Sequence, residues 1–150
     1  MEEQPENCTD GGGNKFGYLL SKRRGYYHRL DGPAIEWSDG SKHWYKDDKL
    51  HRLDDPAVED VDGIKEWWVD GKFHRLDGPA IEWENGTKQW WVDDKLYRLG
   101  GPAVEYASGT KEWWIDGRQM PTKEVETWLE ENNIDLTTEE GQMALKLRWS

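Results

Sequence analysis

Apolar and polar residues alternate along most of the chain, and short turn motifs interrupt the alternation at regular intervals. The segment that begins His28-Arg29-Leu30-Asp31-Gly32-Pro33-Ala34 returns at His51, at His74 and, with tyrosine in place of histidine, at Tyr97. The spacing is 23 residues each time. Self-similarity at a fixed short period is typical of repeat proteins. The sequence therefore predicts four tandem copies over residues 28–119.

Each copy contains two stretches of strand length that end in turn dipeptides such as Asp39-Gly40 and Asp70-Gly71. Both residues of such a dipeptide tolerate a positive φ, which makes it a strong signal for a β-hairpin. Two copies have Asp47-Asp48 and Asp93-Asp94 at the second turn instead. We therefore predict a mainly β fold, a single-layer antiparallel β-meander of 23-residue repeats with about eight to ten strands.

The length of each turn decides which side chains share a face of the sheet. If residues 39–40 form a two-residue turn, Ile35 lies opposite Trp44. A two-residue turn at residues 70–71 places Trp68 opposite Phe73. In the first two copies, one face then carries Ile35, Trp37, Trp44, His51 and Leu53, and the other carries Ala34, Glu36, Tyr45, Arg52 and Glu66.

The segment before the repeats divides into two parts. Residues 1–14 are polar and contain a glycine triplet, so we expect a disordered tail. Residues 15–27 contain a short apolar run followed by a basic turn. We interpret residues 15–27 as a degenerate N-terminal half-repeat that covers the first edge strand.

Residues 120–150 leave the repeat and predict a helical C-terminal cap. In the first helix Val125, Trp128 and Leu129 fall on one stripe. The spacing of Thr137 and Glu140 resembles a capping box, which predicts the start of a second helix. That helix would run to about residue 148 with Met143 and Leu147 turned toward the sheet.

The charge of the chain limits its partners. The 150 residues include 31 acidic and 20 basic side chains, for a net charge of -11. Binding to nucleic acid or to an anionic membrane depends on Lys and Arg, so we expect neither partner. Acidic charge suits a partner with a basic surface. The lone Cys8, the lack of a signal-peptide pattern and the lack of a long apolar run favour a cytoplasmic protein.

Each copy carries one arginine and, seven residues later, one glutamate. We interpret these residues as a structural ion ladder rather than an anion-binding clamp, because a carboxylate within reach neutralises each guanidinium group. The set consists of Arg29, Arg52, Arg75, Arg98, Glu36, Glu59, Glu82 and Glu105.

The repeated histidines are spaced unfavourably for a metal site. His28, His51 and His74 recur once per copy, so they would lie two strand spacings apart, about 9.6 Å. A metal ion needs three or four ligands at about 2 Å. We expect these rings to stack on tryptophan, and we predict no metal and no cofactor. The chain also lacks a nucleophile–base pair and a glycine-rich phosphate loop, so we do not expect an enzyme.

Eleven tryptophans stand against two phenylalanines, and they fall in rows. The row that begins at Trp44 lies among Ile and Val and is expected to be core. The row that begins at Tyr45 either stabilises the thin sheet by stacking or forms a binding surface. The candidate protein-binding residues are Tyr45, Trp68, Trp91, Trp114, Trp37, Trp83 and Tyr106.

The segment WWVDGKFHRLDGPAIEWENGTK, residues 67–88, resembles the MORN repeat. It is most similar to a divergent branch with His-Arg-x-Asp-Gly-Pro-Ala and a Trp-Trp or Trp-Tyr pair, found in bacteria, bacteriophages and large DNA viruses. Where the ordinary repeat has Gly-x-Gly, this chain has Asp-Gly-Pro-Ala. The resemblance covers residues 28–119 and implies a β-meander that serves as a binding or scaffolding surface.

We therefore predict a non-enzymatic module that binds and occludes or scaffolds a partner protein, as an accessory inhibitor of a host protein from a phage or mobile element. Such an inhibitor would act in the host cytoplasm. A homo-oligomer formed through the uncovered sheet face is a further possibility. The alternatives are an aromatic platform for a sugar or a choline-like ligand and an acidic mimic of nucleic acid.

Overall fold

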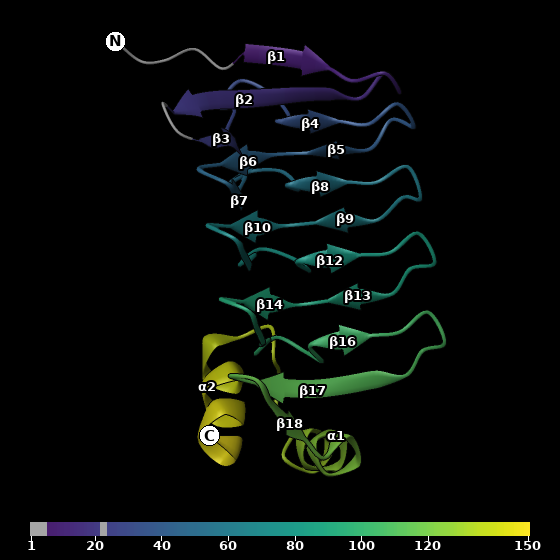
Figure 1. Cartoon of the computed structure of the whole chain (residues 1–150). Coiled ribbons are helices and arrows are strands. Elements are labelled where there is room, and N and C mark those ends of the chain that lie inside the picture. Colours follow the sequence, from purple (N-terminus) through teal and green to yellow (C-terminus); the bar gives the residue numbers. More distant parts are fainter. Residues whose placement is uncertain (1–5, 22–23) are drawn as a thin grey trace. The chain divides into compact units, whose positions relative to one another are not determined.

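The computed structural model describes residues 6–21 and 24–150. The chain divides between His74 and Arg75 into two compact units, an N-terminal and a C-terminal one. Both units are antiparallel β-meanders with an open sheet, and two helices follow the last strands of the second unit (Figure 1). This architecture confirms the predicted mainly β meander with a helical C-terminal cap.

The N-terminal unit contains eleven strands among its described residues. They are β1 (Glu6–Thr9), β2 (Lys15–Ser21), β3 (Arg24–Tyr27), β4 (Ile35–Glu36), β5 (Lys42–His43), β6 (Tyr45–Lys46), β7 (Lys49–Leu50), β8 (Val58–Glu59), β9 (Lys65–Glu66), β10 (Trp68–Val69) and β11 (Lys72–Phe73). The main sheet has the order β1-β2-β4-β5-β8-β9, and β3 pairs with β2. The pairs β6-β7 and β10-β11 are separate hairpins.

The C-terminal unit repeats this pattern and then leaves it. Its elements are β12 (Ile81–Glu82), β13 (Lys88–Gln89), β14 (Trp91–Val92), β15 (Lys95–Leu96), β16 (Val104–Glu105), β17 (Lys111–Ile115), β18 (Arg118–Met120), α1 (Thr122–Glu131) and α2 (Glu139–Trp149). The sheet order is β12-β13-β16-β17-β18, and β14-β15 is a hairpin beside it.

The second turn of each copy is a two-residue hairpin turn, as predicted. Asp70 and Gly71 have φ values of 51° and 78°, and Trp68 pairs with Phe73. Positive φ at both positions defines a type I′ turn, whose twist matches that of the flanking strands. Asp47 and Asp48 adopt the same conformation, with φ values of 51° and 62°. The aspartates therefore fill positions where glycine or asparagine is usual.

The first turn of each copy is longer than predicted, and this changes the faces of the sheet. Ile35 pairs with His43, not with Trp44. Residue 37 donates its backbone N–H to the Ser41 carbonyl at 2.9 Å, which leaves three residues in the loop. Gly40, at φ 101°, is the left-handed residue of the G1 bulge that such loops contain. The extra residue moves every later side chain to the other face.

The corrected register defines two faces. The aromatic face carries Ile35, His43 and Val58, which lie opposite one another across β4, β5 and β8. Tyr45 follows on this face, because side chains two residues apart along a strand share a side. Trp44 points to the other side, which we call the loop face. The sequence pattern predicts Trp44 beside Ile35, and the three-residue loop makes that prediction wrong.

The loop face takes its name from the repeated His-Arg-Leu-Asp segments that lie on it. In the N-terminal unit, the Arg52 guanidinium carbon lies 4.0 Å from the centre of the Trp44 ring. In the C-terminal unit, the Arg98 guanidinium lies 3.7 Å from the centre of the Trp90 ring. Arginine stacking on tryptophan combines cation–π attraction with burial of the ring. The arginine of each of these loops thus holds the loop against the sheet.

The two C-terminal helices cover the end of the loop face, at β17. Trp113 and Ile115 of β17 are buried with Val125 and Leu145, and further apolar side chains of both helices pack around them. Val125, predicted to face inward, is fully buried. Trp128 and Leu129 are partly buried against the same cluster, as their stripe predicted.

The second helix differs from its prediction in start and orientation. Its N-cap is Thr138, whose hydroxyl oxygen accepts the Gly141 N–H at 3.1 Å, so the Thr137–Glu140 capping box does not form. Leu145 is buried, whereas Met143 and Leu147 are 56% and 74% exposed. The prediction that these two residues face inward is wrong. Close packing of Gly141 against the preceding loop sets the helix face instead.

The first residues also differ from expectation. Residues 6–9 of the expected disordered tail form β1, which pairs with β2. The Asp10 carboxylate accepts the N–H groups of Gly12 and Asn14, which closes the turn between the two strands. Composition gives no sign of this strand, because its stability comes from backbone pairing along the sheet edge. Residues 1–5 lie outside the described residues.

Candidate functional site

Three tryptophans of the aromatic face, one in the N-terminal unit and two in the C-terminal unit, are each held in place by a hydrogen bond along their own strand. The indole Nε1 of Trp68 donates to Glu66 Oε2 at 2.8 Å, and that of Trp114 donates to Glu112 Oε2 at 2.9 Å. Trp91 donates to Gln89 Oε1 at 2.9 Å. All three tryptophans are half-buried. Each ring therefore has a fixed orientation and an accessible part.

In the N-terminal unit, the aromatic face is built from pairs of rings. Trp37 meets His43 edge to face, with centroids 4.3 Å apart. Tyr45 packs near Tyr27, with centroids 5.4 Å apart. These separations fall in or near the range of favourable aromatic contacts. Burial raises the pKa of the Tyr45 hydroxyl above its ordinary value of 10.0, so the ring stays neutral at physiological pH.

The stack of Trp68 on Phe73 bears on ligand binding. The two ring centroids lie 3.6 Å apart with an interplanar angle of 33°. Phe73 is the cross-strand partner of Trp68 in the two-residue hairpin. One side of the indole is thus occupied by the protein itself, which makes Trp68 a poor platform for a stacked sugar. The same contact fixes the ring for binding a larger surface.

In the C-terminal unit, Tyr106 and Trp114 share one carboxylate. The Tyr106 hydroxyl donates to Glu112 Oε1 at 3.0 Å, while Trp114 uses the other oxygen of Glu112. The bond to Glu112 raises the pKa of Tyr106, because it stabilises the protonated hydroxyl. Tyr106 is 38% exposed. Trp83 occupies the equivalent position one copy earlier and is half-buried.

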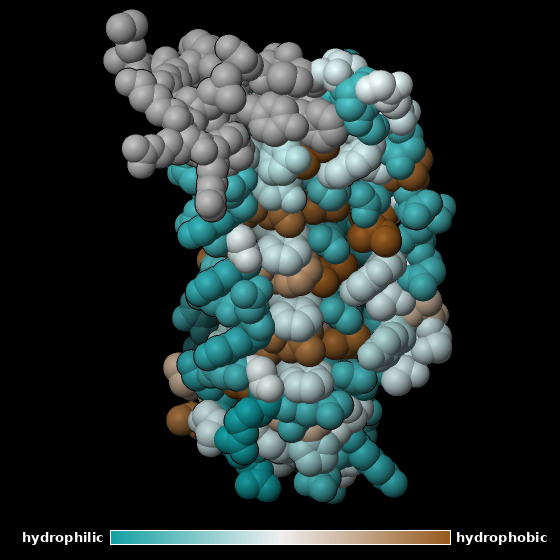
Figure 2. All heavy atoms as spheres, viewed as in Figure 1, coloured by the Kyte–Doolittle hydropathy of each residue, from teal (hydrophilic) through white to brown (hydrophobic). Residues whose placement is uncertain are grey.

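The cap leaves the aromatic face of the C-terminal unit open. The helices pack around Trp113, and the next residue, Trp114, points to the other side of β17 and is half-buried. Figure 2 shows one side of the sheet, where hydrophobic and intermediate side chains gather along the strands between hydrophilic borders. By the observed register, the seven residues predicted to bind protein lie on the aromatic face of their own unit: Trp37, Tyr45 and Trp68 in the N-terminal unit, and Trp83, Trp91, Tyr106 and Trp114 in the C-terminal unit.

The arginines and glutamates predicted as an ion ladder are brought together within each copy. Arg98 Nη1 lies 2.6 Å from Glu105 Oε1, and Arg52 Nη1 lies 3.1 Å from Glu59 Oε1. The other two pairs are Arg75–Glu82 at 3.3 Å and Arg29–Glu36 at 3.9 Å. Each arginine also donates to the carbonyl of the proline four residues later. These arginines tie each loop to the following strand.

Two repeated histidines contact partners that the sequence pattern does not predict. His28 Nδ1 lies 2.9 Å from Asp47 Oδ1, and His51 Nδ1 lies 2.9 Å from Asp70 Oδ1. The partner is the turn aspartate 19 residues later, rather than a tryptophan or the nearby loop aspartate. A strict 19-residue spacing between His and a turn Asp was the available signal. The contacts join each loop to the next hairpin.

Two properties of the described residues concern metal ions and membranes. Within residues 6–21 and 24–150, no three His, Cys, Asp or Glu side chains converge as a metal-binding group would. The helices in the same residues are too short and polar to cross a membrane.

Models of known protein families give no match to this chain, and curated proteins give none either. The resemblance to MORN repeats stays a prediction.

Proposed function

We propose that this protein is a non-enzymatic interaction module that binds a partner protein through the aromatic face. The observation that carries the proposal is that Trp91 and Trp114 of the C-terminal unit, like Trp68 of the N-terminal unit, are each half-buried and each fixed by a hydrogen bond to a residue two positions earlier. The cap packs on the opposite side of β17. The face is therefore ordered and accessible.

The chemistry of the row suits protein recognition. Tryptophan and tyrosine supply large contact areas with few rotatable bonds, and they are enriched among residues that dominate binding energies. Rings held by hydrogen bonds have already lost their rotamer freedom, so little further conformational entropy is lost on binding. The face therefore combines apolar contact area with preorganisation.

The acidic groups beside the rings indicate a basic partner. Glu66 and Glu112 accept indole hydrogen bonds on this face, and Asp60 lies 3.2 Å from His43 Nε2. The chain as a whole carries a net charge of -11. Such a field speeds association with a positively charged surface and disfavours acidic partners. The partner we infer offers apolar anchors ringed by Lys or Arg.

Several fixed aromatic side chains on the face of one unit favour occlusion or scaffolding of a protein over capture of a small molecule. The resemblance to repeats found in bacteria, phages and large DNA viruses supports our proposal of an accessory inhibitor that acts in the host cytoplasm. The covered side of Trp68 argues against the sugar or choline platform. Titration of choline and of sugars against intrinsic tryptophan fluorescence separates the two functions, and saturable quenching would favour the small ligand.

The test is affinity capture with matched variants, with mass spectrometry to identify what is retained. The aromatic-face variant carries Trp91→Ala and Trp114→Ala. The control carries Leu30→Ala and Leu53→Ala, two loop side chains that are 77% and 71% exposed. We expect one stoichiometric protein with the wild type and the control, and its loss with the aromatic-face variant while the circular dichroism spectrum is retained. Retention by both variants would contradict the proposal.

A further inference from the structure

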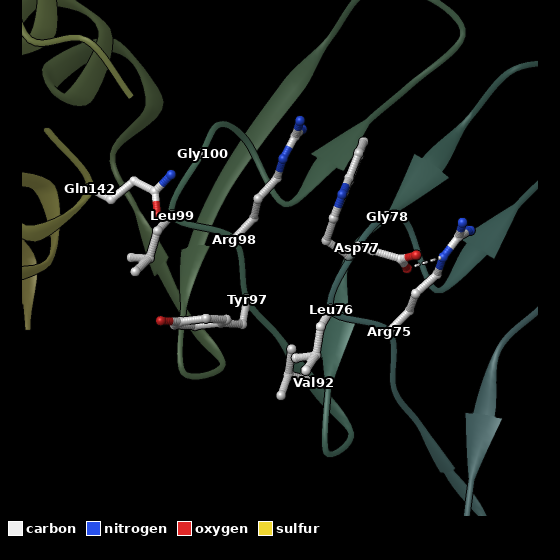
Figure 3. A pocket seen from close by; sticks show the side chains of 11 residues that line it. Arg75, Leu76, Asp77, Gly78, Val92, Tyr97, Arg98, Leu99, Gly100 and Gln142 are labelled. Carbon is white, nitrogen blue, oxygen red and sulfur yellow. Dashed lines mark hydrogen bonds and ion pairs between the residues drawn. The ribbon is translucent and has the colours of Figure 1, made fainter. Parts of the chain in front are cut away.

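A groove lies on the loop face of the C-terminal unit, between the third and fourth loops (Figure 3). Its volume is about 360 Å³. Leu76 and Leu99 stand on its two sides, and Val92 and Tyr97 lie between them. Polar residues line it as well: Arg75 and Asp77 of the third loop, which pair with each other at 2.9 Å, Arg98 of the fourth loop, and Gln142 from α2. The groove is separate from the aromatic face, because Val92 and Trp91 point to opposite sides of the strand.

The two leucines of the groove have different surroundings. Leu99 packs against the buried cluster of the cap. Gly100 lies beside the Leu136 carbonyl, 3.7 Å from the position of an added Cβ atom, so the segment before α2 covers this loop. Leu76, at the same position of the preceding copy, is 80% exposed. The C-terminal cap therefore covers Leu99 of the fourth loop and leaves Leu76 of the third loop exposed.

The helix beside the groove carries an uncovered apolar pair. Met143 and Leu147 are 56% and 74% exposed and lie four residues apart on α2, so they form one short ridge. Lys146 and Arg148 give the same end of the helix a positive charge. Gln142, on the same helix, lines the groove. The same helix therefore carries the ridge and one side of the groove.

We propose that the occupant of the groove is α2 of a second copy of this chain. Met143 and Leu147 of each copy would lie against Leu76 and Val92 of the other, as an amphipathic helix fills a groove. Because the same helix carries the ridge and one side of the groove, a two-fold axis satisfies both at once and gives a closed dimer. The Arg75 guanidinium of the third loop is paired with two carboxylates, Asp77 at 2.9 Å and Glu82 at 3.3 Å, so this loop keeps a negative charge toward the basic end of the incoming helix.

The equivalent groove of the N-terminal unit is a poorer site for the same helix. There Lys46 and His51 take the places of Val92 and Tyr97, while Leu30 and Leu53 form the sides. A lysine ammonium group loses hydration under an apolar helix, which costs free energy. It would also repel the basic end of α2. Leu30 therefore provides a control position that has the same sequence context and lies outside the proposed contact.

The size of the contact indicates a weak dimer. A few apolar side chains from each copy form an interface at the small end of the specific range, below roughly 1,200 Å² in total. Loss of one buried leucine weakens binding by about tenfold or more, and each substitution occurs twice in a symmetric dimer. Leu76→Glu or Leu147→Glu should therefore raise the dimer dissociation constant by about 100-fold or more.

Analytical ultracentrifugation of the full chain from micromolar to millimolar concentration tests this. We expect a mass that rises from the monomer value of 17.6 kDa to twice that value. Leu76→Glu and Leu147→Glu should each stay monomeric over the same range, and Leu30→Glu should behave as the wild type. A wild type that stays monomeric would overturn the proposal, as would a dimer that neither substitution weakens or that Leu30→Glu weakens equally.

A mixing experiment tests direct contact and removes the ambiguity of a misfolded variant. Leu76→Lys and Leu147→Glu should each be monomeric alone. Mixed together, they form a heterodimer in which the introduced lysine lies against the introduced glutamate at one contact and the native leucine pair forms the other. Native mass spectrometry with one isotopically labelled chain measures this species. No heterodimer from two variants with native circular dichroism would contradict the two-fold contact, and species larger than a dimer would contradict its closure.

Discussion

Substitution of Gly141 by alanine tests how the second helix is held. An added Cβ atom would lie 1.9 Å from the backbone oxygen of Asp135 and 2.6 Å from its carbonyl carbon. Ordinary Cβ atoms stay at least 3.0 Å from such atoms, so this loop would have to retreat by about 1 Å. The Asp135 carbonyl also accepts the Thr138 hydroxyl at 2.8 Å. Its displacement would therefore disturb the N-cap residue.

The expected cost follows from three contributions. Overpacking against backbone costs about 1–3 kcal/mol, and loss of the Thr138 cap costs about 1 kcal/mol. Alanine in place of glycine inside a helix returns about 1 kcal/mol. We therefore expect Gly141→Ala to lower the free energy of unfolding of the cap by about 2 kcal/mol.

Urea denaturation measures this change, with hydrogen exchange of the α2 amides as a local probe. Ala144→Gly on the same helix is the matched control, and it should cost about 1 kcal/mol from backbone entropy alone. If Gly141→Ala instead stabilised the protein, as an ordinary helix position would, the close packing against Asp135 would not hold in solution.

Three further predictions concern the repeats. Arg98→Lys should lower the free energy of unfolding by about 1–2 kcal/mol in urea denaturation, because lysine keeps the charge but loses the planar contact with Trp90; an unchanged midpoint would contradict this. Asp116 has a φ of 49°, so Asp116→Val should cost about 1–2 kcal/mol by the same measurement while Asp116→Gly costs little, and equal costs would refute the conformational explanation. Arginine hydrogen bonds hold the pKa of Asp31 and Asp77 below the ordinary value of 3.8, so their contribution is present above that pH and is lost as the pH falls through the lowered pKa values. With Asn at both positions, the melting temperature should fall less steeply as the pH is lowered. An unchanged fall in the melting temperature would show that these Asp–Arg pairs do not cause it.

The 23-residue period predicts the fold because the turns that repeat with it form from neighbouring residues. Each two-residue turn contains residues that accept a positive φ, and the pairing of Trp68 with Phe73 followed from turn length alone. The mainly β meander with a helical cap is confirmed for the same reason. Arg98 and Glu105 meet because seven residues of chain bring loop and strand together within one copy.

The errors came from features that the sequence pattern does not encode. An Asp-Gly dipeptide fits both a two-residue turn and a three-residue loop with a bulge, and this single-residue difference moved Trp44 to the other face. The spacing of apolar residues in α2 allows either Leu145 or Met143 to face the protein interior. The close contact of Gly141 with the Asp135 backbone turns the helix so that Leu145 is buried and Met143 is exposed. Both choices depend on tertiary packing rather than on local preference.

Photo-crosslinking from the two sides of the sheet tests most directly whether the partner binds through the aromatic face. Benzoylphenylalanine replaces Tyr106 on the aromatic face in one variant and Lys111 on the loop face in the other. Both positions belong to the hairpin of β16 and β17, so the chain context is matched. We predict that the position 106 probe captures the partner protein and the position 111 probe does not. Capture from position 111 alone would contradict binding through the aromatic face.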